Sequence, residues 1–286
     1  AVRTASLDNT EGLDIETAKL IAKLALSAKL DGNVHPVSLL HSTKVDPAEL
    51  GGTPAQIFEP FLRKQREKGQ NSFLVVPFFF GHSAAIYEYL PQRVREMSKD
   101  WPELEVRIAP SMVKLDEPGD TRVAGILGDL VIRKIEEEGL VQPAVTLVDH
   151  GTPRTAVNKV RNHVAGQLAE VLKDYVSVVV ASSMERREGD EYAFNEPLLE
   201  NLLGQEKFEK DVVLSMLFIS PGRHAGPGGD IAQIRHEAEK KSDGLRTFAS
   251  SLFATHPGVV DLLAERYAEG LSGDPIAGEV PAPDTR

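Results

Sequence analysis

AVTLVDHG, residues 144–151, runs from a continuous apolar segment directly into a histidine. VSLLHST, residues 37–43, has a similar pattern and also ends in a histidine followed by hydroxylated residues. Unbroken apolar runs of this length are typical of strands that are buried on both faces of a parallel sheet. The two stretches are either strands that end in histidines with a structural role, or the same position of a duplicated unit whose histidines carry its chemistry.

Strand-like and helix-like segments alternate on both sides of residues 144–151. The apolar segments at 72–81 and 104–112 are separated by amphipathic stretches, and the same order recurs after residue 151 with apolar segments at 175–184, 211–220 and 245–253. This alternation predicts an α/β fold of two tandem, doubly wound parallel-sheet domains related by duplication. The first half is expected to be one strand shorter than the second.

The segment EEEGLVQPA at 136–144 combines charge, glycine and proline, and it is the expected domain boundary. We expect an N-terminal arm and helix at 1–34, a first domain at 35–140 and a second domain at 141–271. Residues 272–286 are rich in proline and glycine, which predicts a flexible tail or a strap onto a neighbour.

Composition excludes several classes of protein. The 286-residue chain has a formal net charge of −11 and no cysteine. The acidic balance argues against nucleic acid and anionic membranes as partners, and the lack of thiols excludes disulfides and thiolate-bound metals. No apolar run is long enough to span a membrane and the N-terminus lacks the pattern of a signal peptide, so we expect a cytoplasmic monomer or homodimer.

Each half delivers one histidine after its first predicted strand and another after a later one. The pairs are His41 with His82, and His150 with His224. In parallel sheets the carboxyl ends of the strands line the ligand crevice, so each pair is expected to converge and to bind a metal. Two imidazoles can hold a divalent metal or take protons from a ligand nitrogen, and both abilities suit the insertion of a metal into a nitrogen ring. Glu185, directly after a strand, is expected to face the same crevice.

The segment SPGRHAGPGGDI at 220–231 is the second candidate for ligand contact. Gly222 and Gly226 are expected to let the backbone approach a ligand, and Asp230 is expected to cap the next helix. The loop matches no phosphate-binding pattern. Arginines close to the histidines can meet ligand carboxylates, namely Arg186, Arg187 and Arg223.

Several of these stretches together resemble the CbiX/SirB class II chelatases, which insert cobalt or iron into sirohydrochlorin. The resemblance is carried by HGTPR at 150–154, SMERREGDEYAFNEPLLENLL at 183–203, LFISPGRHAGPGGDI at 217–231, THPGVVDLL at 255–263 and VVPFFFGHSAAIYEYLP at 75–91. It implies flavodoxin-like domains, a tetrapyrrole substrate, Co²⁺ or Fe²⁺ as the second substrate, and no organic cofactor. It also implies that His150 and His224 bind the metal and that Glu185 assists.

The sequence departs from that family in three places. VSLLHST lacks the glycine that follows the histidine in the family, the first half has no counterpart of Glu185, and the insertion REGDEYAFNEP is not typical of minimal members. The function predicted is metal insertion for siroheme or cobalamin synthesis, with Arg223 and the glycine loop steering ring carboxylates. The alternatives are a non-catalytic carrier of metal or tetrapyrrole on the same fold, and a metal-dependent hydrolase.

The remaining histidines are predicted to be structural. We expect His163 and His236 on the surface, and His35 and His256, each followed by proline, in turns. The run Phe78–Phe80 is predicted to belong to the core.

Overall fold

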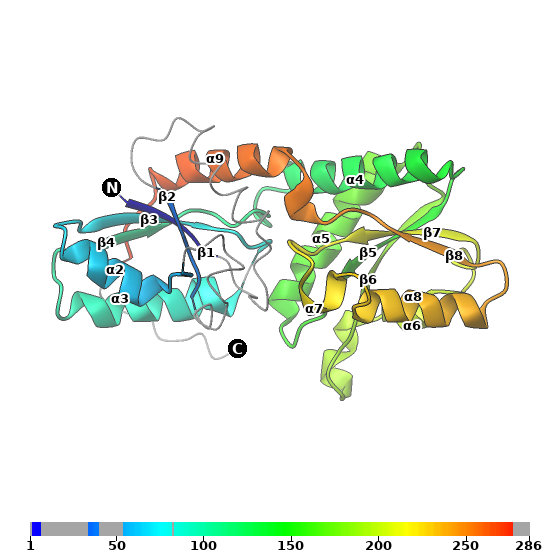
Figure 1. Cartoon of the computed structure of the whole chain (residues 1–286), viewed down its shortest axis with the longest axis horizontal. Coiled ribbons are helices and arrows are strands. Elements are labelled where there is room, and N and C mark those ends of the chain that lie inside the picture. The colour runs from blue at the N-terminus through cyan, green and yellow to red at the C-terminus, as the bar shows by residue number, and fades with distance from the viewer. Residues whose placement is uncertain (1, 7–33, 40–53, 82, 277–286) are drawn as a thin grey trace. The chain divides into compact units, whose positions relative to one another are not determined.

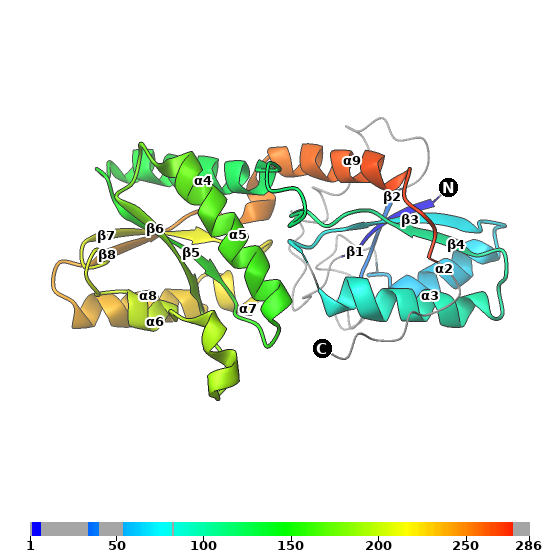
Figure 2. The ribbon, with the colours of Figure 1, turned by 180° about the vertical axis from the view of Figure 1, so that it is seen from behind.

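The computed structural model describes residues 2–6, 34–39, 54–81 and 83–276 (Figures 1 and 2). The chain divides into two compact units, which are described separately. The first unit comprises Ala1–Met112 and Val260–Arg286, and the second comprises Val113–Val259. Within the described ranges, no helix combines the length and the apolar composition needed to cross a lipid bilayer.

The first unit contains a parallel four-stranded sheet in the order β2-β1-β3-β4. Its strands are β1 (Val2–Ser6), β2 (Val34–Val37), β3 (Ser72–Pro77) and β4 (Glu105–Ile108). Its helices are α2 (Phe58–Arg66), the π-helical turn η3 (Ala85–Tyr89), α3 (Leu90–Ser98) and most of α9 (Gly258–Gly270). Figure 1 shows α2 and α3 on one face of this sheet and α9 on the other, as expected for a doubly wound unit.

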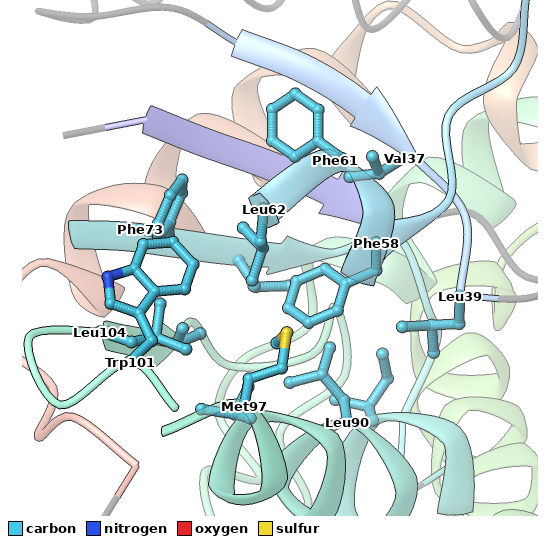
Figure 3. Packing of buried hydrophobic residues seen from close by; sticks show 14 residues of the cluster. Val37, Leu39, Phe58, Phe61, Leu62, Phe73, Leu90, Met97, Trp101 and Leu104 are labelled. Carbon is cyan, nitrogen blue, oxygen red and sulfur yellow. The ribbon is translucent and has the colours of Figure 1, made fainter. Parts of the chain in front are cut away.

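The core of the first unit lies between its sheet and the pair α2 and α3. Figure 3 shows Phe58 and Leu62 of α2 close to Met97 of α3, with Trp101 against Phe73 at one end of the cluster. The rings of Phe73 and Trp101 meet edge to face with centroids 6.0 Å apart, an arrangement that aromatic pairs prefer. Phe78 is buried, as predicted for the phenylalanine run, whereas Phe79 and Phe80 are only half-buried.

The second unit repeats the same sheet order, β6-β5-β7-β8, again with all strands parallel. Its strands are β5 (Ala144–Asp149), β6 (Val178–Ser183), β7 (Asp211–Met216) and β8 (Arg246–Ala249). Its helices are α4 (Arg122–Glu138), α5 (Thr155–Leu172), η4 (Asp190–Asn195), α6 (Leu199–Leu202), α7 (Gly222–Ala225), α8 (Asp230–Lys241) and η5 (Phe253–Thr255). The predicted α/β class with two parallel sheets is therefore correct.

The matching sheet orders correct the alignment of the two halves. β1 and β5 occupy the same position in their sheets, and so do β2 and β6. Two isolated bridges, Ser38 to Ile57 and Ser183 to Leu198, lie at the equivalent ends of β2 and β6. VSLLHST therefore continues from β2, the counterpart of β6, and its alignment with the end of β5 was wrong. The strand that the first half was expected to lack is β1, which lies within the expected N-terminal arm.

Two helices lie in a different unit from the one expected for a boundary at residue 140. α4 follows β4 in the chain but packs against α5 and β7 of the second unit. α9 follows the second unit's last strand, but Arg266 donates hydrogen bonds to the carbonyl oxygens of Ser111 and Met112 in the first unit, at 2.9 and 2.7 Å. The glycine and proline near residue 140 mark only the end of a helix, where Gly139 has φ +62°.

The first residues of the C-terminal segment are attached to the first sheet, so the expectation of a flexible tail is wrong for them. The Ile276 amide donates to the Val106 carbonyl at 2.8 Å, and its side chain packs on the core cluster of Figure 3. Arg107 donates to the Gly273 carbonyl at 2.9 Å. Residues 277–286, and the helix expected before residue 34, lie outside the described residues.

Candidate functional site

His150 lies directly after the central strand β5, and backbone contacts to the next strand fix its position. The Met184 amide donates to the Asp149 carbonyl at 2.8 Å, and the Glu185 amide donates to the His150 carbonyl at 3.2 Å. The pairing of β5 and β6 thus continues past the strand ends and places His150 beside Glu185. Gly151 makes this possible, because its φ is +93° and a Cβ there would lie 1.9 Å from the Glu185 carbonyl oxygen.

His224 comes from the short helix α7 in the glycine-rich loop after β7. This loop is folded tightly on itself. A Cβ on Gly229 would lie 2.5 Å from the Arg223 carbonyl oxygen, and one on Gly226 would lie 2.8 Å from that of Gly222. Gly226 and Gly229 are therefore needed by the loop itself, whereas Gly222, at φ +47°, is exposed with open space around it.

The structure brings together the three residues that the sequence predicted for the second half. The rings of His150 and His224 meet edge to face with centroids 4.6 Å apart. The Nε2 atom of His150 lies 3.5 Å from Oε1 of Glu185, and their side chains are 44% and 60% exposed. The group is accordingly open to a ligand from solution.

Both imidazoles have Nδ1 engaged by an acceptor. Nδ1 of His224 lies 2.5 Å from Oδ2 of Asp230, and Nδ1 of His150 lies 3.1 Å from the Gly151 carbonyl oxygen. Because a carbonyl oxygen accepts only, Nδ1 of His150 carries a hydrogen. A carboxylate orients His224 in the same way, so Nε2 is the free nitrogen of each ring, as is common for metal-binding histidines.

The pair formed by His150 and Glu185 is suited to bind a cation. With the hydrogen of a neutral His150 on Nδ1, the Nε2 lone pair faces the Glu185 carboxylate across 3.5 Å. A metal ion between the two groups can accept a lone pair from each of them. This arrangement therefore suits a metal ion at Nε2 of His150.

Asp230 was predicted to cap α8, and this prediction was wrong. Asp230 is the first residue of α8, the cap position belongs to Gly229, and no side chain makes a capping hydrogen bond. The carboxylate accepts from His224 instead. The sequence pattern that could have predicted this contact is the six-residue spacing between His224 and Asp230 across a glycine-rich turn.

A buried polar group, which the sequence did not predict, holds the backbone of the His150 loop. Asp149, 9% exposed, accepts from Ser183 Oγ at 2.6 Å and from the Gly151 amide at 3.1 Å. The guanidinium of Arg161, 2% exposed, lies 3.9 Å from the same carboxylate. Burial raises the pKa of Asp149, against the lowering effect of Ser183 and Arg161, and burial also lowers the pKa of Arg161.

The insertion after Glu185 is fastened to the His150 loop by the same group. Arg161 donates to the carbonyl oxygens of Asn195 at 2.9 Å and Phe194 at 3.3 Å. The buried Asn195 side chain accepts from the Thr152 amide at 3.0 Å and donates to the Thr152 carbonyl at 2.9 Å. The insertion and the histidine loop therefore form one hydrogen-bonded structure.

The three predicted arginines differ in what they can offer a ligand. Arg186 donates to Glu196 at 2.8 Å and to the carbonyl oxygens of Arg187 and Gly189, so it is used within the insertion. The hydrogen bond from Arg186 holds the pKa of Glu196 below its usual value. Arg187 and Arg223 are both exposed, and neither forms an ion pair with another described residue.

Among the residues that the structure describes, no three His, Asp or Glu side chains are arranged to hold a metal ion. His150, His224 and Glu185 are close together without forming a preset cage. His41 and His82 lie outside the described residues, so the first-half pair stays a prediction.

The other histidines have only in part the structural settings that were predicted. His236 is exposed. His256 is buried, and its Nδ1 accepts from the Gly258 amide at 3.1 Å at the start of α9. His35 lies in strand β2, so its predicted place in a turn was wrong, and its ring packs against Phe61 with centroids 4.9 Å apart. His163 is half-buried, with an Nε2 atom that makes no hydrogen bond, so its placement on the surface was wrong.

Comparison with known proteins links the fold to one group of solved structures. No protein-family model matches the sequence, and no curated protein matches it. The fold is shared with SirB from Bacillus subtilis with Fe³⁺, at a TM-score of 0.68 and 14% identity over 95% of each chain. It is shared with the sirohydrochlorin chelatase SirB of Bacillus subtilis subspecies spizizenii in complex with cobalt, at a TM-score of 0.63 and 12% identity over 94% of each chain. CbiX, described as the terminal enzyme of siroheme biosynthesis in denitrifying bacteria, has a TM-score of 0.58 and 16% identity over 95% of this chain and 99% of its own. The resemblance to the CbiX/SirB class II chelatases thus extends to the whole fold.

Proposed function

We propose that this protein inserts Co²⁺ or Fe²⁺ into a tetrapyrrole such as sirohydrochlorin, with its site in the second unit. The observation that carries the proposal is the approach of His150 Nε2 to Oε1 of Glu185, at 3.5 Å, beside the ring of His224. It occurs on the fold of SirB and CbiX, whose solved structures contain iron in one case and cobalt in another.

The donor set suits a metal that is delivered and released. Imidazole and carboxylate both accept Co²⁺ and Fe²⁺, and a site with few protein ligands leaves coordination positions open for ring nitrogens. Structural metal sites, in contrast, are closed by four protein ligands. The half-exposed and incomplete arrangement of His150, His224 and Glu185 therefore fits a metal that is a substrate.

The reaction exchanges two pyrrole protons for the metal. Nε2 of His150 and Nε2 of His224 hold the ion while the ring approaches, and each pyrrole N–H that loses its proton gains a bond to the metal. As the ion leaves, Nε2 of His150 and the Glu185 carboxylate become free to accept the two protons and pass them to water. Asp230 keeps Nε2 of His224 available throughout, because it holds the other nitrogen.

Anaerobic insertion of Co²⁺ and Fe²⁺ into sirohydrochlorin, followed by the change in ring absorbance, tests the proposal. The variant His150→Ala combined with His224→Ala is expected to lose turnover, whereas the exposed His236→Ala control keeps it. The variant His41→Ala with His82→Ala tests the first-half pair in the same assay. Turnover that survives loss of His150 and His224 would overturn the assignment of the site to the second unit.

A carrier of metal or tetrapyrrole is the second candidate, because imidazoles and a carboxylate that are open to solution can also bind an ion without transferring it to a ring. A carrier would bind the ring or the ion in a fixed ratio and show no turnover. Tight binding by the wild-type protein without metal insertion under reducing, anaerobic conditions would replace the chelatase proposal with this one.

A further inference from the structure

The insertion at 187–197 is held at both ends, and its tip projects from the sheet. Ser183 pairs with Leu198 and its amide donates to the Pro197 carbonyl at 3.1 Å, so the chain leaves β6 and returns to it at the same place. Figure 1 shows the short yellow-green helical turn of this segment projecting beyond α6. Arg161 and Asn195 fasten its returning end to the loop of His150.

The insertion carries an exposed arginine, Arg187, that forms no ion pair with another described residue. Arg186 is bound to Glu196 and two carbonyl oxygens. Arg187, the next residue, is exposed and its guanidinium carbon lies 5.9 Å from the ring centroid of Tyr192. Acidic side chains follow closely at Glu188, Asp190 and Glu191, yet within the described residues Arg187 has no salt bridge with any of them.

Tyr192 restricts the position of this guanidinium without neutralising its charge. A guanidinium that stacks on an aromatic face can still donate hydrogen bonds from its N–H groups. Two of these groups can bind the two oxygens of one carboxylate in parallel. Arg223, on the other loop of the site, is the second exposed arginine without an ion pair among described residues. The two arginines belong to the loops that carry Glu185 and His224. Each arginine lies within two residues of one of these metal-binding candidates in the sequence.

We propose that Arg187, oriented by Tyr192, is a specificity residue that binds a carboxylate of the tetrapyrrole ring, with Arg223 binding another. This inference rests on the proposed function and adds a recognition role for the insertion. Sirohydrochlorin carries acetate and propionate groups around its rim, so one ring offers a separate carboxylate to each arginine. The nearby Glu188, Asp190 and Glu191 repel anions that lack this two-point attachment.

The test compares sirohydrochlorin with its fully esterified analogue, which keeps the ring nitrogens and loses the carboxylates. For Arg187→Ala we expect KM for sirohydrochlorin to rise about fivefold, as for one exposed ion pair, with kcat and Co²⁺ affinity unchanged. KM for the ester is expected to stay at the wild-type value. Tyr192→Phe keeps the aromatic face and should match wild type, and Tyr192→Ala should shift KM in the direction of Arg187→Ala.

Lys173→Ala is the matched control, because it removes one exposed positive charge from the same unit. An equal rise in KM for the control, or an equal rise for acid and ester in Arg187→Ala, would refute the specificity role. Direct binding of both rings, followed by absorbance without metal, separates this inference from the proposed function. Ring binding that weakens in Arg187→Ala for the acid alone supports the inference even where turnover is absent.

Discussion

Nδ1 of His224 lies 2.5 Å from Oδ2 of Asp230, so the imidazole that faces His150 is oriented by a carboxylate on the next helix. The relationship joins the glycine-rich loop to the start of α8 and fixes which nitrogen of His224 is free. Its orientation is therefore set by the fold before any metal arrives.

Asp230→Ala is expected to weaken binding of Co²⁺ by about 10–100-fold, because His224 loses the partner that sets its ring orientation. Titration with Co²⁺, followed by the visible d–d absorption of the bound ion, measures the affinity. Asp243→Ala removes an exposed carboxylate and serves as the control. Unchanged affinity and an unchanged spectrum in Asp230→Ala would show that Asp230 does not act on the metal site.

Gly151→Ala is expected to destabilise the protein by about 1–3 kcal/mol and to abolish activity, because the positive φ and the nearby Glu185 carbonyl both exclude a Cβ. Urea unfolding followed by circular dichroism gives the free energy of unfolding. In α5, a methyl group on Gly166 would meet nothing within 4 Å, so Gly166→Ala should instead stabilise by about 0.5–1 kcal/mol. A stable Gly151→Ala with intact activity would contradict the close approach of the two loops.

Asn195→Ala is expected to loosen the insertion from the His150 loop, because both hydrogen bonds to Thr152 are lost. The free energy of unfolding should fall by about 2 kcal/mol. Amide hydrogen exchange should rise within residues 186–197 and 150–154 while the strands stay protected. Asn201→Ala, which removes an exposed amide side chain from α6, should leave exchange in both segments at the wild-type level.

Stability is expected to fall between pH 7.5 and 5.5 through His256. Burial lowers the pKa of His256 below its ordinary value of 6.5, Arg133 lowers it further, and Asp129 opposes them. The unfolded chain therefore binds a proton at a pH where the folded protein does not, and stability is lost as pH falls below about 6.5. Urea unfolding at both pH values should show a smaller loss in His256→Gln than in wild type. His236→Gln, at an exposed position, should show the wild-type loss, and equal pH dependence in all three proteins would exclude this contribution.

The sequence could predict the convergence of His150, His224 and Glu185, because parallel strands end at one edge of a sheet and each residue follows a strand. It could not predict Asp149, Arg161 or Asn195 as their support. A polar residue in a helix or loop usually faces solvent, and only the fold places Arg161 on the buried face of α5.

The strand order was the harder part of the fold to predict. Val2–Ser6 is short and contains arginine, threonine and serine, so it lacks the apolar run that marked the other central strands. With β1 unrecognised, the strand that leads to His41 was matched with β5, although its counterpart in the second unit is β6. The unit to which α4 and α9 each belong depends on packing between segments that are distant in the sequence. Local composition therefore could not predict it.

The division of the chain also has a consequence for the order in which the protein is completed during synthesis. Residues 113–259 form an uninterrupted unit, which can close while the ribosome is still adding the rest of the chain. The first unit is made earlier but lacks α9 and the segment that ends at Ile276, whose amide joins β4. The half that is translated first is therefore finished after the second unit, because its four-stranded sheet lacks the cover of α9 until residues 260–276 have been made.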